Sequence, residues 1–270
     1  SDLAGLFCLE NPMRVFDFTR AIVREPAPSV VRGLRSGSSP DPDFGKLIAE
    51  HRAYVSALQS AGLRIDVLSP LEAYPDSIFV EDPAFVLPEG AVLLRPGAPS
   101  RLGERDELRG VLKNHFGRVE ELSGDEYADG GDVLVTPKTI FIGLSKRTNH
   151  AGAKALQALL ASFGRDARVV QTPPAILHFK TASSLLAEDT ILCTAAMAQS
   201  SIFKDFRLVV TPDGEEAAAN ALRARDTVFL GDDFPRTRDL IRGLGMAVQT
   251  LAVAEIARLD AGLSCMSLRW

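Results

Sequence analysis

A short pattern of apolar runs recurs along the chain about every 45 residues, and this repeat is the feature that most restricts the fold. In most copies two strand-like runs are followed by a helical segment and a further strand-like run. One copy passes from Asp132–Val135 and Thr139–Ile142 through a helix at Asn149–Phe163 to Ala167–Val170. A unit this short cannot bury its own apolar face, so successive units must pack against one another. The repeat therefore favours a ring or solenoid of α/β units, with an ordinary mixed α/β sheet as the alternative.

The two ends of the chain favour a closed ring over an open array. The first strand-like run, Thr19–Val23, lacks the leading run that the other units have. At the other end of the chain, Ser264–Arg269 is an additional strand-like run that belongs to no complete unit. If the last run completed the first unit, five units would close, and we therefore expect one catalytic domain over residues 1–270. Amphipathic spacing and stop signals predict four helices along it, at Lys46–Ala61, Arg105–Phe116, Asn149–Phe163 and Pro235–Leu244.

Charge and composition exclude several classes of protein. The 270 residues carry 30 basic and 35 acidic side chains, a net charge of −5, with no Lys/Arg-rich run, which argues against nucleic-acid binding. No apolar stretch is long enough to span a bilayer, and the first residues lack the basic start of a secretory signal. The three cysteines, Cys8, Cys193 and Cys265, show no CxxC spacing. We expect a cytoplasmic enzyme that contacts neither nucleic acid nor membrane.

One cysteine and one histidine stand out as a candidate nucleophile and base. Cys265 follows the turn at Gly262, at the start of the expected last strand, whereas Cys193 lies within an apolar run. His178 lies in an apolar segment that we interpret as a strand. A single cysteine with a distant histidine is a candidate catalytic pair, although both types also serve as ordinary core residues.

Acidic and basic residues near strand ends predict a binding site for a ligand with a positive charge at one end and a negative charge at the other. The acidic ones are Asp76, Glu81, Asp82 and the pair in Asp129-Gly130-Gly131-Asp132, and they would suit a guanidinium. Arg101 and Arg147 each follow a strand end, and in a ring they would face one axis and hold a carboxylate. The alternatives are a surface turn for the acidic motif and solvated surface charges for the arginines.

Six segments in one order resemble the dimethylarginine dimethylaminohydrolase family of the guanidino-group-modifying superfamily. The resemblance covers nearly the whole chain from about residue 15, in the order of the family's own motifs. The segments are Asp76–Asp82, Arg95–Arg101, Asp129–Leu134, Gly143–Asn149, Leu177–Lys180 and Ser264–Ser267. The resemblance implies a five-bladed α/β propeller of ββαβ repeats with pseudo-fivefold symmetry, which agrees with the expected ring.

The resemblance also implies roles for individual residues. Cys265 would be the nucleophile and His178 the general acid and base. The substrate would be held by residues that fall into three groups: Asp82 and Asp129 on the guanidinium with Glu81 supporting them and Phe79 beside it, Arg101 and Arg147 on the α-carboxylate, and Asp76 with the Leu34 carbonyl on the α-amine. Asp129 stands where the bacterial pattern has Glu, whereas vertebrate members share this Asp-Gly-Gly-Asp motif.

The implied activity is hydrolysis of Nω-methylated arginines to L-citrulline and an amine, without a metal or an organic cofactor. An arginine deiminase, which releases ammonia, is the nearest alternative. A non-catalytic propeller that binds a macromolecule and a zinc site made by Cys265, His178 and an acid are two further ones. The oligomeric state stays open, with a homodimer as one option.

Overall fold

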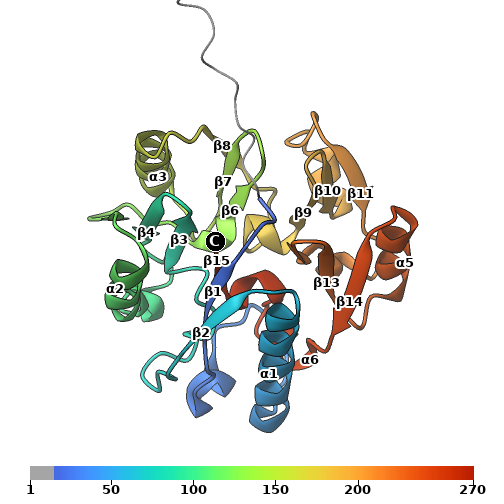
Figure 1. The fold of residues 1–270 in the computed structure, drawn as a ribbon, viewed down its shortest axis with the longest axis horizontal. Coiled ribbons are helices and arrows are strands. Elements are labelled where there is room, and N and C mark those ends of the chain that lie inside the picture. Colours follow the sequence, from blue (N-terminus) through green and yellow to red (C-terminus); the bar gives the residue numbers. More distant parts are fainter. Residues whose placement is uncertain (1–14) are drawn as a thin grey trace, which may run out of the picture.

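Five three-stranded sheets surround one axis in the computed structural model of the chain, which describes residues 15–270 (Figure 1). In every sheet the middle strand pairs antiparallel with one neighbour and parallel with the other. The strand orders are β15-β1-β2, β3-β4-β5, β6-β7-β8, β9-β10-β11 and β12-β13-β14. This arrangement confirms the predicted five-bladed α/β propeller.

Each blade is a continuous stretch of chain except the first. The strands are β1 Arg20–Arg24, β2 Arg64–Leu68, β3 Ala84–Leu87, β4 Gly90–Leu93, β5 Val119–Glu121, β6 Val133–Val135, β7 Ile140–Leu144, β8 Ala167–Gln171, β9 Ser183–Ala187, β10 Thr190–Cys193, β11 Arg207–Val210, β12 Leu222–Ala224, β13 Thr227–Gly231, β14 Ala247–Leu251 and β15 Leu268–Arg269. The helices are α1 Phe44–Ser60, α2 Glu104–His115, α3 His150–Ser162, α4 Ala195–Gln199, α5 Pro235–Gly243 and α6 Ala254–Ala257.

The last strand closes the ring, as the spare run at the end of the sequence predicts. β15 pairs antiparallel with β1 through Ala21↔Arg269 and Ile22↔Leu268. The run is shorter than expected, because Leu263–Met266 forms a 3₁₀ turn ahead of the two-residue strand. Cys265 therefore lies in a turn and not in a strand.

The four predicted helices are present with ends that differ by one or two residues. Asn149 caps α3 by accepting a hydrogen bond from the Gly152 N–H at 2.8 Å, and Asp43 caps α1 in the same way through the Lys46 N–H. One predicted strand is displaced. By the same repeat the apolar run Ala219–Leu222 predicts the leading strand of the last unit, but residues 216–219 form a 3₁₀ turn and the strand begins only at Leu222.

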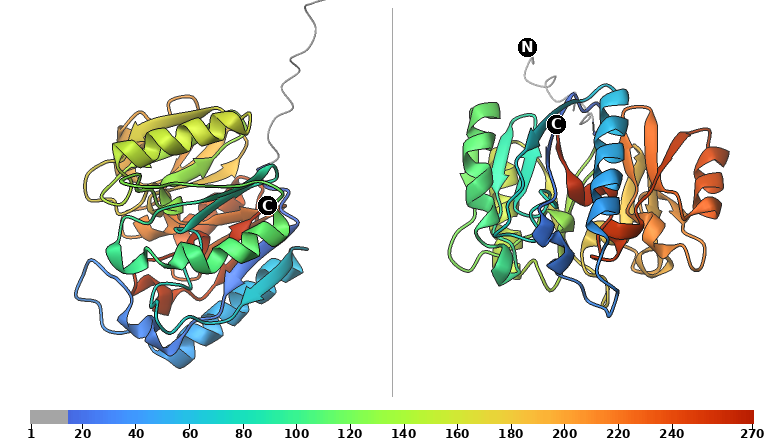
Figure 2. Two further views of the ribbon diagram at one scale, coloured as in Figure 1. Left: turned by 90° about the vertical axis from the view of Figure 1, so that its left-hand side faces the viewer. Right: turned by 90° about the horizontal axis from the view of Figure 1, so that it is seen from below.

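The apolar core is divided into five clusters, and each combines buried side chains of two neighbouring blades with those of a helix. The helices lie on the outside of the ring (Figure 2). In the first cluster, α1 buries Leu47, Tyr54 and Leu58 completely or almost completely. Burying each such side chain contributes roughly 1.5–3 kcal/mol. Because this burial takes place at the periphery, polar side chains can occupy the axis. No helix within residues 15–270 is both long and apolar enough to cross a bilayer.

Candidate active site

Five segments meet at one end of the axis, and each directly precedes the first strand of a blade. Asp82 precedes β3, Asp129 precedes β6, His178 precedes β9, Asn220 precedes β12 and Cys265 precedes β15. The pseudo-fivefold repeat thus delivers one polar side chain from every blade to a common place. The contacts form two groups: His178 Nε2 lies 2.9 Å from Asp129 Oδ2 and 4.0 Å from Asp82 Oδ1, and Asn220 Nδ2 lies 3.7 Å from Cys265 Sγ.

A small pocket of about 30 Å³ contains most of the predicted site residues. It is lined by Leu34, Asp76, Phe79, Asp82, Arg101, Arg147, Leu177, His178, Leu259, Asp260, Ala261 and Cys265. Asp129 does not line it but lies behind His178, fully buried. The side chain of Glu81 faces a different cavity on the other side of Ser264.

His178 is held by a loop and not by the strand that the sequence suggested, because β8 ends at Gln171 and β9 begins at Ser183. Its neighbour Phe179 is fully buried and packs on Phe141 and Phe203 with ring centroids 6.2 and 5.5 Å apart. The Phe179 N–H donates to Asp132 Oδ1 at 2.8 Å. This anchored phenylalanine fixes the place of the imidazole.

Asp132 has a positioning role that the sequence analysis did not assign. Besides the Phe179 N–H, its carboxylate accepts hydrogen bonds from Ser145 Oγ and Thr148 Oγ1, both at 2.6 Å. Burial raises the pKa of Asp132 to about 6, although His178 and the two hydroxyls oppose that rise. Within Asp129-Gly130-Gly131-Asp132, the Asp129 carboxylate therefore faces the imidazole of His178. The Asp132 carboxylate connects the loops that hold this imidazole in place.

The two glycines of that motif are required by close approach. A Cβ on Gly130 would lie 2.0 Å from the Glu81 carbonyl oxygen. A Cβ on Gly131 would lie within 3.0 Å of both the His178 ring and Asp82. Neither glycine has a positive φ. The two glycines therefore serve through the space they leave, which the imidazole of His178 and the carboxylate of Asp82 fill.

Opposite charges set the protonation of His178 and Asp82. Burial would lower the pKa of His178, but the carboxylates of Asp82, Asp129 and Asp132 outweigh it and raise that pKa to about 9. Burial would raise the pKa of Asp82, but His178 and Arg101 outweigh it and hold that pKa at about 2. At neutral pH the pair is therefore an imidazolium beside carboxylates, so His178 carries a proton that it can give to a leaving group.

Cys265 is partly buried, and its thiol is neutral in this environment. Burial and then the charges of Glu81 and Asp82 raise its pKa to about 11, while the Gly262 backbone contact and Asn220 lower it. Asn220 fits this place tightly: its Oδ1 accepts from the Ser264 N–H at 3.1 Å, and a Cβ on Gly262 would lie 2.4 Å from its side chain. Asn220 is the blade residue that the sequence analysis missed.

The two predicted arginines differ in their surroundings. Arg101 is 4% exposed and pairs with Asp82 at 2.5 Å and with Glu104 at 2.8 Å, and it also donates to the carbonyls of Asp76 and Phe79. Arg147 is 18% exposed, with an ion pair of 3.6 Å to Asp129. Arg147 can therefore reorient towards a ligand, whereas Arg101 holds the acidic segment in place.

Asp76 and Leu34 are in contact across the pocket. The Leu34 N–H donates to Asp76 Oδ1 at 2.9 Å, while the Leu34 side chain is 39% exposed. The segment after it is fixed by the Ser36 N–H, which donates to Asp260 Oδ2 at 2.5 Å. Leu34 thus lines one side of the pocket, while residues 36–38 are exposed.

Asp82, Asp129 and His178 also have the spacing of a metal site, since their ligand atoms lie within 4.8 Å of one another. This group does not include Cys265, in contrast to the zinc alternative. Both carboxylates of this group already face cations, since Asp82 pairs with Arg101 and Asp129 pairs with Arg147. The same acids can therefore neutralise a cationic group without a metal ion.

The chain resembles solved and curated proteins of one family. A sequence profile described as N,N dimethylarginine dimethylhydrolase, eukaryotic, matches residues 39–211. The N(G),N(G)-dimethylarginine dimethylaminohydrolase of Pseudomonas aeruginosa is 35% identical over 94% of this chain and 100% of its own. The protein of that name from Streptomyces coelicolor is 31% identical over 93% of this chain and 96% of its own.

The structural comparison agrees with the sequence comparison. A cysteine-to-serine mutant of the Pseudomonas aeruginosa protein, complexed with citrulline, matches over 94% of this chain and 100% of its own with a TM-score of 0.92. The N-terminal domain of ArgZ, a cyanobacterial arginine dihydrolase, matches over 94% and 97% with a TM-score of 0.83, and at 17% identity it shares the fold alone. On this identity and coverage, the chain belongs to the dimethylarginine dimethylaminohydrolase family of guanidino-modifying hydrolases.

Proposed function

We propose that the chain hydrolyses Nω-methylated arginines to L-citrulline and dimethylamine or methylamine. The observation that carries this proposal is the set of Cys265, His178 and Asp82 in one pocket, with a charged imidazole between two carboxylates. The citrulline bound by the Pseudomonas aeruginosa relative supports the same product here.

The pocket suits an amino acid that is charged at both ends. Asp82 would neutralise the guanidinium, with Phe79 beside it, while Asp129 would support that charge from behind His178. Arg147 would bind the α-carboxylate, and Arg101 would hold Asp82 in place. Asp76 and the Leu34 carbonyl would hold the α-amine, since the two residues already meet at the pocket wall. Glu81 would act from behind, because its N–H donates to the Cys265 carbonyl at 3.2 Å.

The reaction has two stages. When the substrate binds, the Cys265 thiol releases its proton to solvent and the thiolate sulfur bonds to the guanidinium carbon. The bond from that carbon to the methylated nitrogen then breaks as the His178 imidazolium gives its proton to the departing amine, which leaves His178 neutral. An S-alkylthiouronium remains. The neutral His178 then takes a proton from water, and the hydroxide adds to the same carbon. The C–S bond breaks with its electrons going to the Cys265 sulfur, and the proton lost from the hydroxyl as it becomes the citrulline carbonyl restores the thiol.

The raised pKa of the thiol indicates how the attack is controlled. A thiol with a pKa of about 11 is almost entirely neutral at pH 7. A bound guanidinium brings a positive charge into contact with the sulfur, and this attraction lowers the thiol pKa. The nucleophile would therefore form when the substrate is in place.

An arginine deiminase would carry out the same chemistry with ammonia as the leaving group, so the products distinguish the two reactions. The experiment is product analysis by mass spectrometry after incubation with arginine, monomethylarginine and asymmetric dimethylarginine. We expect citrulline with methylamine or dimethylamine from the methylated substrates. Citrulline from arginine alone would assign a deiminase instead, and no product from any of the three would favour a binding protein.

Two cysteine variants locate the nucleophile in the same assay. Cys265→Ser should abolish turnover because a hydroxyl ionises far less readily than a thiol. Cys193→Ser is the matched control, since Cys193 is buried in β10. Cys8, the remaining cysteine, lies outside the described residues. Normal turnover by Cys265→Ser would remove this cysteine from the mechanism.

A further inference from the structure

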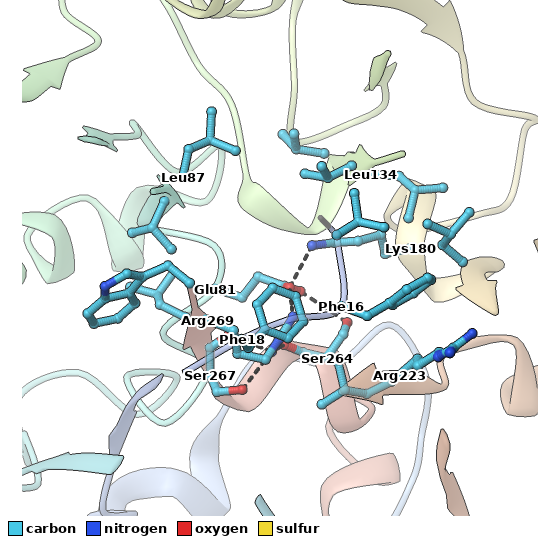
Figure 3. A pocket seen from close by; sticks show the side chains of 18 of the residues that line it. Phe16, Phe18, Glu81, Leu87, Leu134, Lys180, Arg223, Ser264, Ser267 and Arg269 are labelled. Atoms are coloured by element: carbon cyan, nitrogen blue, oxygen red, sulfur yellow. Dashed lines mark hydrogen bonds and ion pairs between the residues drawn. The ribbon is translucent and has the colours of Figure 1, made fainter. Parts of the chain in front are cut away.

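A second cavity lies on the other side of the residues that form the pocket. It has a volume of about 740 Å³, a size typical of small-molecule sites in proteins. Glu81, Lys180, Ser264 and Arg269 form its floor, and Ser264 directly precedes Cys265 in the chain (Figure 3). The cavity is therefore separated from the catalytic pocket by a thin layer of side chains, and none of the proposed catalytic steps uses it.

The floor of this cavity carries more positive than negative charge. Lys180 Nζ lies 2.5 Å from Glu81 Oε1, and Arg269 Nη2 lies 3.3 Å from the same oxygen. The other Glu81 oxygen accepts a hydrogen bond from Ser264 Oγ at 3.1 Å. Two cations thus share a single carboxylate. Five lysine and arginine side chains line the whole cavity against three acidic ones, in a chain whose net charge is −5.

The walls of the cavity are apolar and aromatic. Phe16 and Phe18 lie over the floor, and Leu87 and Leu134 line the opposite wall (Figure 3). Trp270 completes the lining from the end of the chain. Carboxylates are bound where apolar contacts take up the body of a molecule and a cation takes up its end.

We propose that this cavity binds a small amphipathic carboxylate, with its apolar or aromatic body between Phe16, Phe18 and Leu134 and its anionic group on Lys180 and Arg269. A neutral molecule of the same shape would gain no attraction from the excess positive charge of the floor. A cationic one would be repelled by it. The geometry therefore predicts selection by the charge of the ligand.

The test uses a series of probes that differ only in the end group: 4-phenylbutyrate, 4-phenyl-1-butanol and 4-phenylbutylamine. Trp270 is the only tryptophan of the chain and lines the cavity, so its fluorescence reports binding there. We expect 4-phenylbutyrate to bind saturably and at least about 10-fold more tightly than the alcohol, and we expect the amine not to bind. Saturating citrulline should not displace 4-phenylbutyrate. Equal binding of the three probes, no saturation up to millimolar concentrations, or displacement by citrulline would overturn the proposal.

Variants tie the binding to the floor and the wall. Lys180→Met should remove the preference for the carboxylate over the alcohol, and Lys154→Met, on the exposed face of α3, is the matched control that should keep it. Phe16→Ala, at a partly exposed position, should weaken the carboxylate and the alcohol alike. Circular dichroism checks that each variant is folded. If Lys180→Met does not fold, the probe series and Phe16→Ala still test the proposal. If both variants fold and binding is unchanged in both, the proposal is wrong.

Discussion

The thiol of Cys265 lies between groups with opposite effects on its ionisation. Burial, Glu81 and Asp82 favour the neutral thiol, whereas Asn220 favours the thiolate through a contact of 3.7 Å. Because Asn220 also binds the Ser264 N–H, it fixes the backbone that carries the sulfur. One amide therefore acts on both the position and the charge of the nucleophile.

Replacing Asn220 should change the ionisation of the Cys265 thiol. In Asn220→Ala the thiolate loses a hydrogen-bond donor, and a hydrogen bond to a charged group is worth about 1.5–3 kcal/mol. We expect the pKa of Cys265 to rise by about one pH unit or more. The measurement is the pH dependence of alkylation by iodoacetamide, followed by mass spectrometry of the peptide that contains Cys265. Asn114→Ala, on an exposed position of α2, is the control, and an unchanged alkylation profile in Asn220→Ala would show that the amide does not act on the sulfur.

At the scale of elements, the site is a product of the repeat. Periodicity predicted the helices and most strands within one or two residues, and the spare run at the end predicted the closure by β15. Two loop residues were harder to recognise. His178 looks like a strand residue because its neighbours are apolar, yet Phe179 is buried by a turn. Asn220 fell within a predicted strand because alanines surround it, and only the structural equivalence of the five loops identifies it.

Side-chain pairing between loops cannot be predicted from spacing, and Arg101 illustrates this. In the sequence Arg101 and Arg147 look equivalent, since each follows a strand end. In the structure Arg101 belongs to the 3₁₀ turn Pro99–Arg101 and ties the segment 76–82 to the start of α2 through Asp82 and Glu104. Arg101 contacts Asp76, Phe79 and Asp82, which lie 19 to 25 positions away in the chain, and the spacing of the motifs does not reveal this pairing.

Arg101→Ala should therefore affect stability as well as binding. It leaves Asp82 and Glu104 buried without their cation, and breaking such a buried pair typically costs about 3–5 kcal/mol. Urea unfolding monitored by circular dichroism measures this loss. Arg147→Ala is the comparison: it should keep nearly the wild-type free energy of unfolding but bind a substrate carboxylate less well. Equal stability of the two variants would show that the Arg101 network contributes little to the fold.

At the scale of the whole molecule, ion pairs near the axis connect the blades, whereas most other contacts in the propeller are apolar. Asp82, Asp129 and His178 come from the loops ahead of β3, β6 and β9, so each ion pair joins two blades. The stability of the ring is therefore linked to the protonation of one imidazole. This link has a definite sign, because the pKa of His178 is raised in the folded chain.

The folded chain holds the His178 proton up to a pH of about 9, whereas an unfolded chain releases it near pH 6.5. The stabilisation from this proton is complete below pH 6.5 and is lost as the pH rises through about 9, by up to about 3 kcal/mol. Asp82 and Asp132, with pKa values of about 2 and 6, change charge below this window. The raised thiol pKa values of Cys193 and Cys265 also lower stability at high pH, but they do so equally in variants that keep both cysteines.

The experiment compares the free energy of urea unfolding of the wild type and of His178→Gln from pH 6 to pH 10. His178→Gln loses its contacts at every pH, but the difference from the wild type should be largest at pH 6 and should shrink as the pH approaches 9. His150→Gln, at an exposed position at the start of α3, is the control and should show no such trend. A difference that stays constant over the whole range would mean that the imidazole is neutral in the folded chain. In that case His178 could not supply the proton for the leaving amine, and the first stage of the proposed reaction would need another acid.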